Sequence, residues 1–149
     1  IPFKQGADYL TIPAMKEAYG SPGKVITHEY PGFPTDLQPP LTVLLTQTPG
    51  TTLVHETIFA GRLFYVDLLN RMGANIILCD PHRALVQGPT PLRGKRIKSP
   101  DIRAGIAMLI AAPLAEGETV IDNIYQIERG YENIGERFKG LGIKIERVE

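Results

Sequence analysis

Apolar side chains recur at intervals of three and four residues in two stretches, which predicts two helices with one buried face each. The positions that form these stripes are Tyr65, Leu69 and Met72 in the first stretch and Ile134, Phe138 and Leu141 in the second. Gly73 and Gly142 come directly after the stripes and are predicted to end the helices. A third apolar run, 106–115, is hydrophobic on nearly every side, so we expect a helix buried between other elements.

Segments rich in β-branched and aromatic residues predict strands. Segments 51–59 and 119–125 have this composition. Further strands are expected at 74–79 and 143–148, after the two striped helices, and the short segments 83–87 and 95–99 are additional strand candidates. Residues 1–30 are broken by Pro and Gly, and we expect them to be an extended or strand lead-in from a preceding unit. Cys79 lies within an apolar strand segment and is expected to be a small buried core residue.

The same order of features occurs twice along the chain. Asp36 and Asp101 each stand within two residues after a Pro and before an apolar run, so both are predicted to cap a helix N-terminus. Gly50 and Gly117 are expected to end these two helices. The pairs that match at about 65 to 69 residues' distance are Asp36–Asp101, Gly50–Gly117, Thr52–Thr119, Arg62–Arg129 and Gly73–Gly142. This order on nearly constant spacing indicates an internal duplication.

The duplication predicts an α/β fold of repeated α-β-α-β-β units, with helices inside and sheets outside. We expect unit one at residues 31–98 and unit two at residues 99–149, within one structural domain. Two such units do not readily close a core, so a third unit is expected outside this sequence. The first residue is Ile1 and not an initiator Met, which fits the expectation of a piece of a longer protein.

Composition narrows the functional classes. Among 149 residues, 16 Lys and Arg balance 16 Asp and Glu, which argues against nucleic acid or a membrane surface as the main partner. The single Cys cannot form an internal disulfide, and no Cys/His cluster predicts a metal site. No apolar run is long enough for a transmembrane helix, so a cytoplasmic location is expected. The basic stretch 81–103 is typical of a solvated face, with phosphate or RNA binding as the alternative.

Several strings resemble the UDP-N-acetylglucosamine enolpyruvyl transferase (1-carboxyvinyltransferase) family. They are YPGFPTDLQ, HETIFAGR, LLNRMGA, SPDIRAGIAML, AEGETVIDNIYQIERGYENI and LGIKIERVE, and the likeness runs from about Val25 to Glu149. The resemblance implies an inverted (inside-out) α/β barrel domain of three repeated units, of which this chain holds the last two. A missing N-terminal domain would face it across a cleft. The family that makes enolpyruvyl-shikimate phosphate is similar in fold and chemistry, and it matches these strings less well.

The resemblance also implies a reaction. The enolpyruvyl group of phosphoenolpyruvate is transferred to the 3-hydroxyl of UDP-N-acetylglucosamine, and phosphate is released, in the first committed step of bacterial peptidoglycan synthesis. Neither a metal nor an organic cofactor is implied. A carboxylate is needed to take the hydroxyl proton, and arginines suit the carboxylate and phosphate because the guanidinium binds both in bidentate geometry.

By this resemblance, Asp36 is the general base, while the pattern around it alone favours a helix cap. Arg103 and Arg129 would bind phosphoenolpyruvate, with Arg62 in the same pocket and Asp101 orienting groups there. The residues expected to contact the nucleotide sugar are Thr35, Ile58 through its backbone and Phe59 by packing.

Two features depart from these expectations. Ala60 and Gly61 stand where the family has an acidic residue and Asn, which leaves a non-catalytic ligand-binding or scaffold protein as an alternative. Pro113 falls near the end of the predicted buried helix and is expected to kink it. The family's general-acid cysteine belongs to the other domain, so the chain alone is expected to have no turnover.

Overall fold

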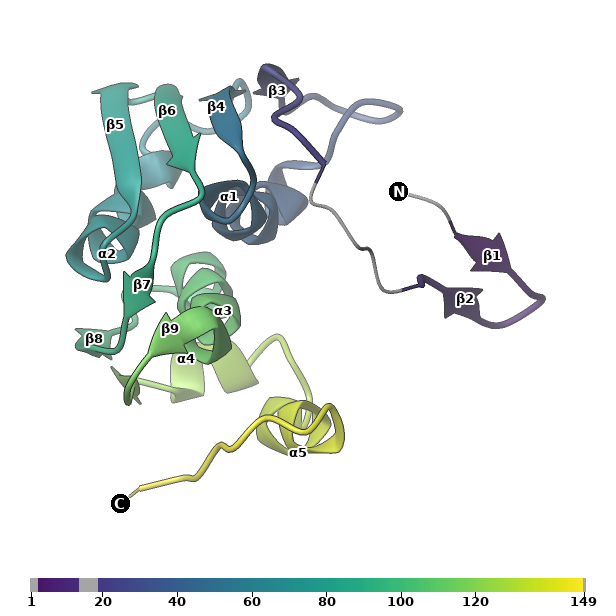
Figure 1. The fold of residues 1–149 in the computed structure, drawn as a ribbon, viewed down its shortest axis with the longest axis vertical. Helices are drawn as coiled ribbons and strands as arrows, with labels where there is room; N and C mark the ends of the chain where they lie inside the picture. Colours follow the sequence, from purple (N-terminus) through teal and green to yellow (C-terminus); the bar gives the residue numbers. More distant parts are fainter. Residues whose placement is uncertain (1–2, 14–18, 149) are drawn as a thin grey trace.

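The computed structural model describes residues 3–13 and 19–148, and its largest sheet has four strands (Figure 1). They are β3 (Lys24–Ile26), β4 (Gly50–His55), β5 (Asn75–Asp80) and β6 (Arg83–Gly88), in the order β3-β4-β6-β5. β3 runs parallel to β4, whereas β6 is antiparallel to both of its neighbours. The strands predicted at 74–79 and 83–87 are therefore confirmed, while the strand predicted at 51–59 ends at His55.

One face of this sheet is buried and the other is open to solvent. The side chains that point inward are Thr52, Val54, Ile76, Ala84 and Val86, in the alternation that a half-buried sheet requires. On the edge strand β5, by contrast, Ile77 is exposed. Cys79 is exposed as well, so its assignment to the core is wrong. Cys79 follows Ile77 by two residues, so it lies on the same solvent-facing side of β5, whereas Ile76 faces the core.

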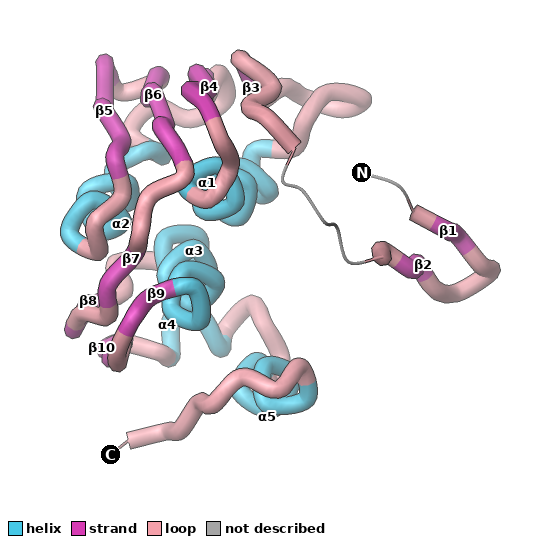
Figure 2. The backbone as a smooth tube through the Cα atoms, viewed as in Figure 1, coloured by secondary structure: helices cyan, strands magenta, loops and turns pink. Residues whose placement is uncertain are grey.

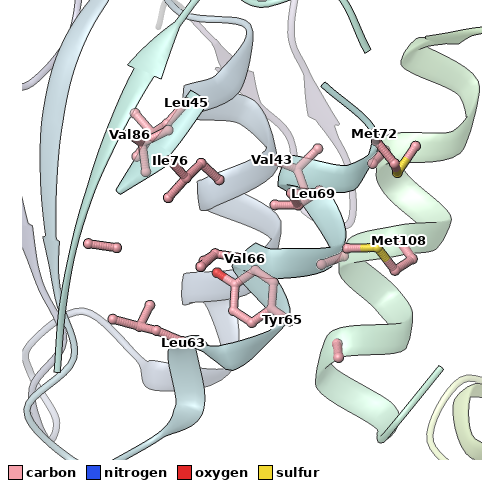
Figure 3. Close-up of a cluster of buried hydrophobic side chains, with 14 of the residues drawn as sticks. Val43, Leu45, Leu63, Tyr65, Val66, Leu69, Met72, Ile76, Val86 and Met108 are labelled. Atoms are coloured by element: carbon pink, nitrogen blue, oxygen red, sulfur yellow. The ribbon is translucent and has the colours of Figure 1, made fainter. Parts of the chain in front are cut away.

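Three helices pack beneath the sheet: α1 (Gln38–Thr46), α2 (Val66–Arg71) and α3 (Ile102–Ala111). Figure 2 shows α1 and α2 directly under the strands, with α3 on their far side. The stripe Tyr65, Leu69 and Met72 is buried among these helices, as predicted (Figure 3). Seven of the ten residues of α3 are buried, which confirms that the apolar run beginning at residue 106 belongs to an interior helix.

The second half of the chain carries short parallel strand pairs. β7 (Leu92–Arg93) pairs with β9 (Ala115–Glu116), and β8 (Arg96–Lys98) pairs with β10 (Val120–Asp122). The strand predicted at 95–99 is confirmed, and the one predicted at 119–125 is shorter. Two helices follow, α4 (Tyr125–Glu128) and α5 (Ile134–Gly140).

The C-terminal part differs from its prediction. Residues 143–148 form no strand, so the strand predicted there is wrong. Of the second apolar stripe, Ile134 is buried and Phe138 is half-buried, but Leu141 is 77% exposed. A strand needs a neighbour for its backbone groups, and among the described residues this segment pairs with none.

The two halves share one local arrangement. In the first, β3 leads through α1 to the parallel strand β4, and in the second β8 leads through α3 to the parallel strand β10. The residue after each first strand is a buried hydroxyl residue, Thr27 or Ser99. The Thr27 N–H donates to the His55 carbonyl at 2.9 Å, and the Ser99 N–H donates to the Asp122 carbonyl at 3.0 Å. This equivalence supports the duplication that the sequence indicates.

The two aspartates at the helix starts behave differently. The Asp101 carboxylate accepts from the N–H groups of Arg103 and Ala104, so the predicted cap is confirmed. Asp36 caps no helix: it lies inside a 3-10 turn, Thr35–Leu37, and its side chain accepts no backbone N–H. One of the two amides that an equivalent cap would use belongs to Pro39, which has no N–H.

Both helices also end earlier than predicted. α1 stops at Thr46 and α3 at Ala111, whereas Gly50 and Gly117 lie beyond them with positive φ angles of 108° and 86°. Pro113 lies in the 3-10 turn Ala112–Leu114 after α3, so it follows the end of that helix and does not kink it. Gly73 and Gly142, with φ angles of 107° and 85°, follow α2 and α5 as predicted.

The lead-in contains β1 (Lys4–Gln5) and β2 (Leu10–Thr11), which form an antiparallel hairpin that stands off from the core (Figure 1). Together with β3 it confirms extended and strand structure in the described part of residues 1–30, while 14–18 lie outside the described residues. Across the described part of the chain, every helix is too short or too polar to cross a bilayer.

Leu69 provides a test of the core. Leu69→Ala removes a fully buried side chain and should lower the free energy of unfolding by about 2–5 kcal/mol. The matched variant Leu44→Ala changes a side chain that is exposed on α1 and should cost less than about 1 kcal/mol. Urea denaturation of both variants measures the difference, and equal losses would contradict the assigned core.

Candidate active site

Three of the expected site residues meet at one carboxylate oxygen. Asp36 comes from the turn before α1, Arg62 from the 3-10 turn before α2 (Arg62–Tyr65), and Arg103 from the first turn of α3. Asp36 Oδ1 accepts from Arg103 Nε at 2.7 Å and from Arg62 Nη1 at 3.1 Å. The hydrogen bond between Asp36 and Arg103 joins positions that are 67 residues apart in the sequence, one in each predicted unit.

The environment of Asp36 favours its charged form. The hydrogen bond from Arg103 holds the pKa of the Asp36 carboxyl below its ordinary value, and the charges of Arg103 and Arg62 act in the same direction. Slight burial opposes this shift without reversing it. The side chain of Asp36 is 67% exposed, so the carboxylate lies at the surface, where a ligand can reach it.

Arg62 is held far more tightly than a surface arginine. Its side chain is only 9% exposed, and Nη1 also donates to the Thr35 hydroxyl at 2.6 Å. The guanidinium lies over the Phe59 ring, 4.2 Å from its centroid, which adds a cation–π contact. Gly61 directly before it has a φ of 75°, a left-handed conformation that glycine adopts without strain. The guanidinium therefore has one well-defined direction.

Glu56 is the site residue that the sequence reasoning missed. It is completely buried after β4 and accepts from the Thr35 hydroxyl at 2.6 Å. Its other oxygen accepts from the backbone N–H groups of Ile58 and Phe59 at 2.9 and 3.1 Å. The signal that could have revealed it is a carboxylate at the end of an apolar strand. A carboxylate buried at such a position needs hydrogen-bond donors to replace its water.

His82 anchors the same loop from the β5–β6 turn. Its Nδ1 lies 2.7 Å from the Glu56 carbonyl, and the Glu56 N–H donates to the His82 carbonyl at 2.7 Å. The sequence reasoning assigned no role to this histidine. The contacts show that it fixes the backbone from which Glu56 projects.

Arg103 is oriented by its own helix start. The Asp101 carboxylate accepts from the Arg103 N–H at 2.7 Å, which holds the first turn of α3 and therefore the base of the Arg103 side chain. Asp101 thus acts on the site through the backbone of α3.

Arg129 and Ile58 lie outside the described contacts around Asp36. Arg129 follows α4, and its Nη1 donates to Gln126 at 3.5 Å; among the described contacts it does not reach Asp36. Its neighbour Gly130 packs against Ile102 at the start of α3, so Arg129 is near the cluster without belonging to it. The N–H of Ile58 is engaged by Glu56, which leaves its carbonyl for a backbone contact to a ligand.

Within residues 3–13 and 19–148, His, Cys, Asp and Glu side chains form no group of three that could hold a metal ion. The cluster around Asp36 instead combines two cations with one exposed carboxylate. This arrangement suits a ligand that carries anionic groups next to a proton to be removed.

Comparison with known proteins shows which family the chain belongs to. A sequence model described as EPSP synthase (3-phosphoshikimate 1-carboxyvinyltransferase) matches residues 3–138, which is most of the chain. The chain belongs to the EPSP synthase family. Among curated relatives, UDP-N-acetylglucosamine 1-carboxyvinyltransferases are similar: that of Treponema denticola is 55% identical over 85% of the chain, and that of Bacteroides thetaiotaomicron 47% identical over 99%.

Solved structures agree with the EPSP synthase family fold. The enolpyruvyl transferase NikO from Streptomyces tendae matches 97% of the chain and 33% of its own, with a TM-score of 0.87 at 26% identity. EPSP synthase from Acinetobacter baumannii matches 76% of the chain and 27% of its own with a TM-score of 0.58, and at 18% identity it supports the fold alone. The fold class is thus the inside-out α/β fold of this family. The chain spans 30% and 36% of the length of the Treponema and Bacteroides relatives.

The pKa of Asp36 tests the arginine pair. Arg103→Ala removes the main cause of the lowered value, so the pKa of Asp36 should rise toward that of a free aspartate. Because the pKa is lower in the folded chain than in the unfolded one, the stabilisation by ionised Asp36 exists above the unfolded pKa. It is lost as the pH falls through the folded pKa.

A carbon-13 NMR titration of the carboxyl group measures this change. Arg147→Ala, which removes an arginine paired with Glu128 instead, is the matched control and should leave the Asp36 titration unchanged. An Asp36 titration that does not respond to Arg103→Ala would contradict the assigned contact.

Proposed function

We propose that the protein containing this chain transfers the enolpyruvyl group of phosphoenolpyruvate to the 3-hydroxyl of UDP-N-acetylglucosamine and releases phosphate. Such a protein would act in the bacterial cytoplasm, in peptidoglycan synthesis. The observation that carries the proposal is the contact of Arg62 and Arg103 with Asp36, in a chain up to 55% identical to proteins named for this reaction.

The geometry suits the proton removal and the charge stabilisation that this chemistry needs. Asp36 takes the proton of the sugar hydroxyl while the hydroxyl oxygen bonds to C2 of phosphoenolpyruvate and a proton is added at C3. The resulting tetrahedral intermediate then loses a proton from its C3 methyl group and expels phosphate from C2, which restores the double bond. Arg62 and Arg103 stabilise the carboxylate and phosphate of the substrate throughout. The acid that protonates C3 would come from the other domain.

The arginines also link substrate binding to the strength of the base. While both donate to Asp36, its pKa stays low and it is a weak base. When the anionic groups of phosphoenolpyruvate take over these donors, the pKa of Asp36 rises and proton removal becomes easier. The carboxylate would thus gain basicity only when the second substrate is in place.

We also propose that residues 31–98 and 99–149 are the last two units of a three-unit domain, facing a further N-terminal domain. The shared arrangement of β3, α1 and β4 with β8, α3 and β10 supports two repeated units, and in each case the first strand lies just before the proposed start of its unit. Arg129 would complete the site when that domain closes. Its position beside the start of α3 fits this role.

Two alternatives follow from particular observations. The matching family model is described as 3-phosphoshikimate 1-carboxyvinyltransferase, an enzyme whose acceptor is shikimate phosphate. An enolpyruvyl-shikimate-phosphate synthase-like activity is therefore the second candidate. Ala60 and Gly61, in place of an acidic residue and Asn, favour a non-catalytic ligand-binding protein. Substrate turnover separates these possibilities.

Phosphate release from phosphoenolpyruvate, assayed on the full-length protein with each acceptor, tests the proposal. We expect turnover with UDP-N-acetylglucosamine and none with shikimate 3-phosphate. Asp36→Asn should lower kcat by about 10²–10⁴-fold, the usual effect of removing a general base. Asp67→Asn, on an exposed aspartate of α2 paired with Arg71, should leave it unchanged. Turnover only with shikimate 3-phosphate supports the second candidate, and none with either acceptor supports a non-catalytic protein.

The isolated chain should show no turnover, because an open half-site leaves its arginines in water, where each contact to an anion is weaker. Calorimetric titration should find at most weak, salt-sensitive binding of phosphoenolpyruvate, reduced further by Arg129→Ala. Measurable turnover, or tight binding that survives Arg129→Ala, would refute this expectation.

A further inference from the structure

Glu56 is a buried carboxylate that the proposed reaction does not use directly. Its side chain is completely buried at the end of β4, directly before the loop that carries Phe59 and Arg62. Burial removes the hydration of a carboxylate, so such a group persists only where donors replace the lost water. The donors present here show what Glu56 holds in place.

Three hydrogen bonds reach Glu56 from two different segments. Oε1 accepts from the N–H groups of Ile58 and Phe59, which bends the loop back onto the end of β4. Oε2 accepts from the hydroxyl of Thr35, which lies 21 residues earlier and precedes Asp36. Glu56 therefore ties the Arg62 loop to the turn that carries the proposed base.

The Thr35 hydroxyl passes this constraint to Arg62. A hydroxyl has one hydrogen, and donating it to Glu56 leaves the lone pairs of the oxygen for an incoming donor. Arg62 Nη1 fills that position at 2.6 Å. With Phe59 against its face, the guanidinium is held on two sides, and the same Nη1 also donates to Asp36 Oδ1 at 3.1 Å.

We propose that Glu56 is a positioning residue that acts through the Thr35 hydroxyl to aim Arg62 at the anionic group of the substrate bound beside Asp36. The identity of that substrate as phosphoenolpyruvate rests on the proposed function. Glu56 touches no reacting atom, and its effect is to keep Arg62 in the direction that binding needs before the ligand arrives.

Glu56→Gln in the full-length protein tests this role. The amide retains one oxygen for the loop N–H groups, but its NH₂ group cannot accept from Thr35. We expect the KM for phosphoenolpyruvate to rise about tenfold or more, the effect of losing one hydrogen bond that holds a charged group. The KM for UDP-N-acetylglucosamine should stay nearly constant. Glu136→Gln, on an exposed glutamate of α5, is the matched control and should change neither value.

A double-mutant cycle separates positioning from general structural support. In an Arg62→Ala background, Glu56→Gln should have no further effect on the KM for phosphoenolpyruvate, because the group it positions is already gone. Thr35→Ser keeps the hydroxyl and should retain a KM for phosphoenolpyruvate lower than that of Thr35→Val, which should reproduce the raised KM of Glu56→Gln. Thr35→Val also supplies the test if Glu56→Gln does not fold.

The outcomes distinguish this inference from the proposed function. Wild-type turnover combined with full additivity of Glu56→Gln and Arg62→Ala would overturn the positioning role alone. If the wild type transfers to neither acceptor, the proposed function fails, and the same cycle is measured as calorimetric binding of inorganic phosphate. In that measurement, the positioning role is supported if Glu56→Gln weakens phosphate binding when Arg62 is present but not in the Arg62→Ala background. An equal loss of binding in both backgrounds overturns it.

Discussion

The sharing of one carboxylate oxygen by two arginines is the interaction on which the site depends. Arg62 and Arg103 come from different halves of the chain and converge on Asp36 Oδ1 at 3.1 and 2.7 Å. Two guanidinium groups so close together repel each other unless an anion lies between them. In the free protein that anion is Asp36, and a ligand with its own negative groups competes for the same donors.

The duplicated architecture explains how distant residues reach this point. Each half places a helix between two parallel strands, and the helices α1 and α3 pack against one another in the interior. The starts of both helices therefore lie close together, with Asp36 at one and Arg103 at the other. At this junction the two halves of the chain make different contributions, since one supplies Asp36 and Arg62 and the other supplies Arg103.

The sequence predicted the elements whose signals are local. The stripe of Tyr65, Leu69 and Met72 depends on burial of one helix face, which periodicity reports directly. The prediction that Asp36 caps a helix is wrong because Pro39 lacks one of the N–H groups that such a cap needs. Two arginines that are distant in the sequence bind the carboxylate instead. The prediction of a strand at 143–148 is wrong because a strand needs a partner strand, and the sequence of a segment alone does not show whether one lies beside it. Glu56 shows the same limit within the site, because its contacts to Thr35 and to the loop backbone follow from no local pattern.

A crystal structure of the full-length protein with phosphoenolpyruvate tests most directly whether a ligand displaces Asp36 from its arginines. We expect Arg62 and Arg103 to donate to the ligand's anionic groups and Asp36 to lose at least the Arg103 hydrogen bond. A ligand bound elsewhere, with both arginines still on Asp36 Oδ1, would contradict this competition.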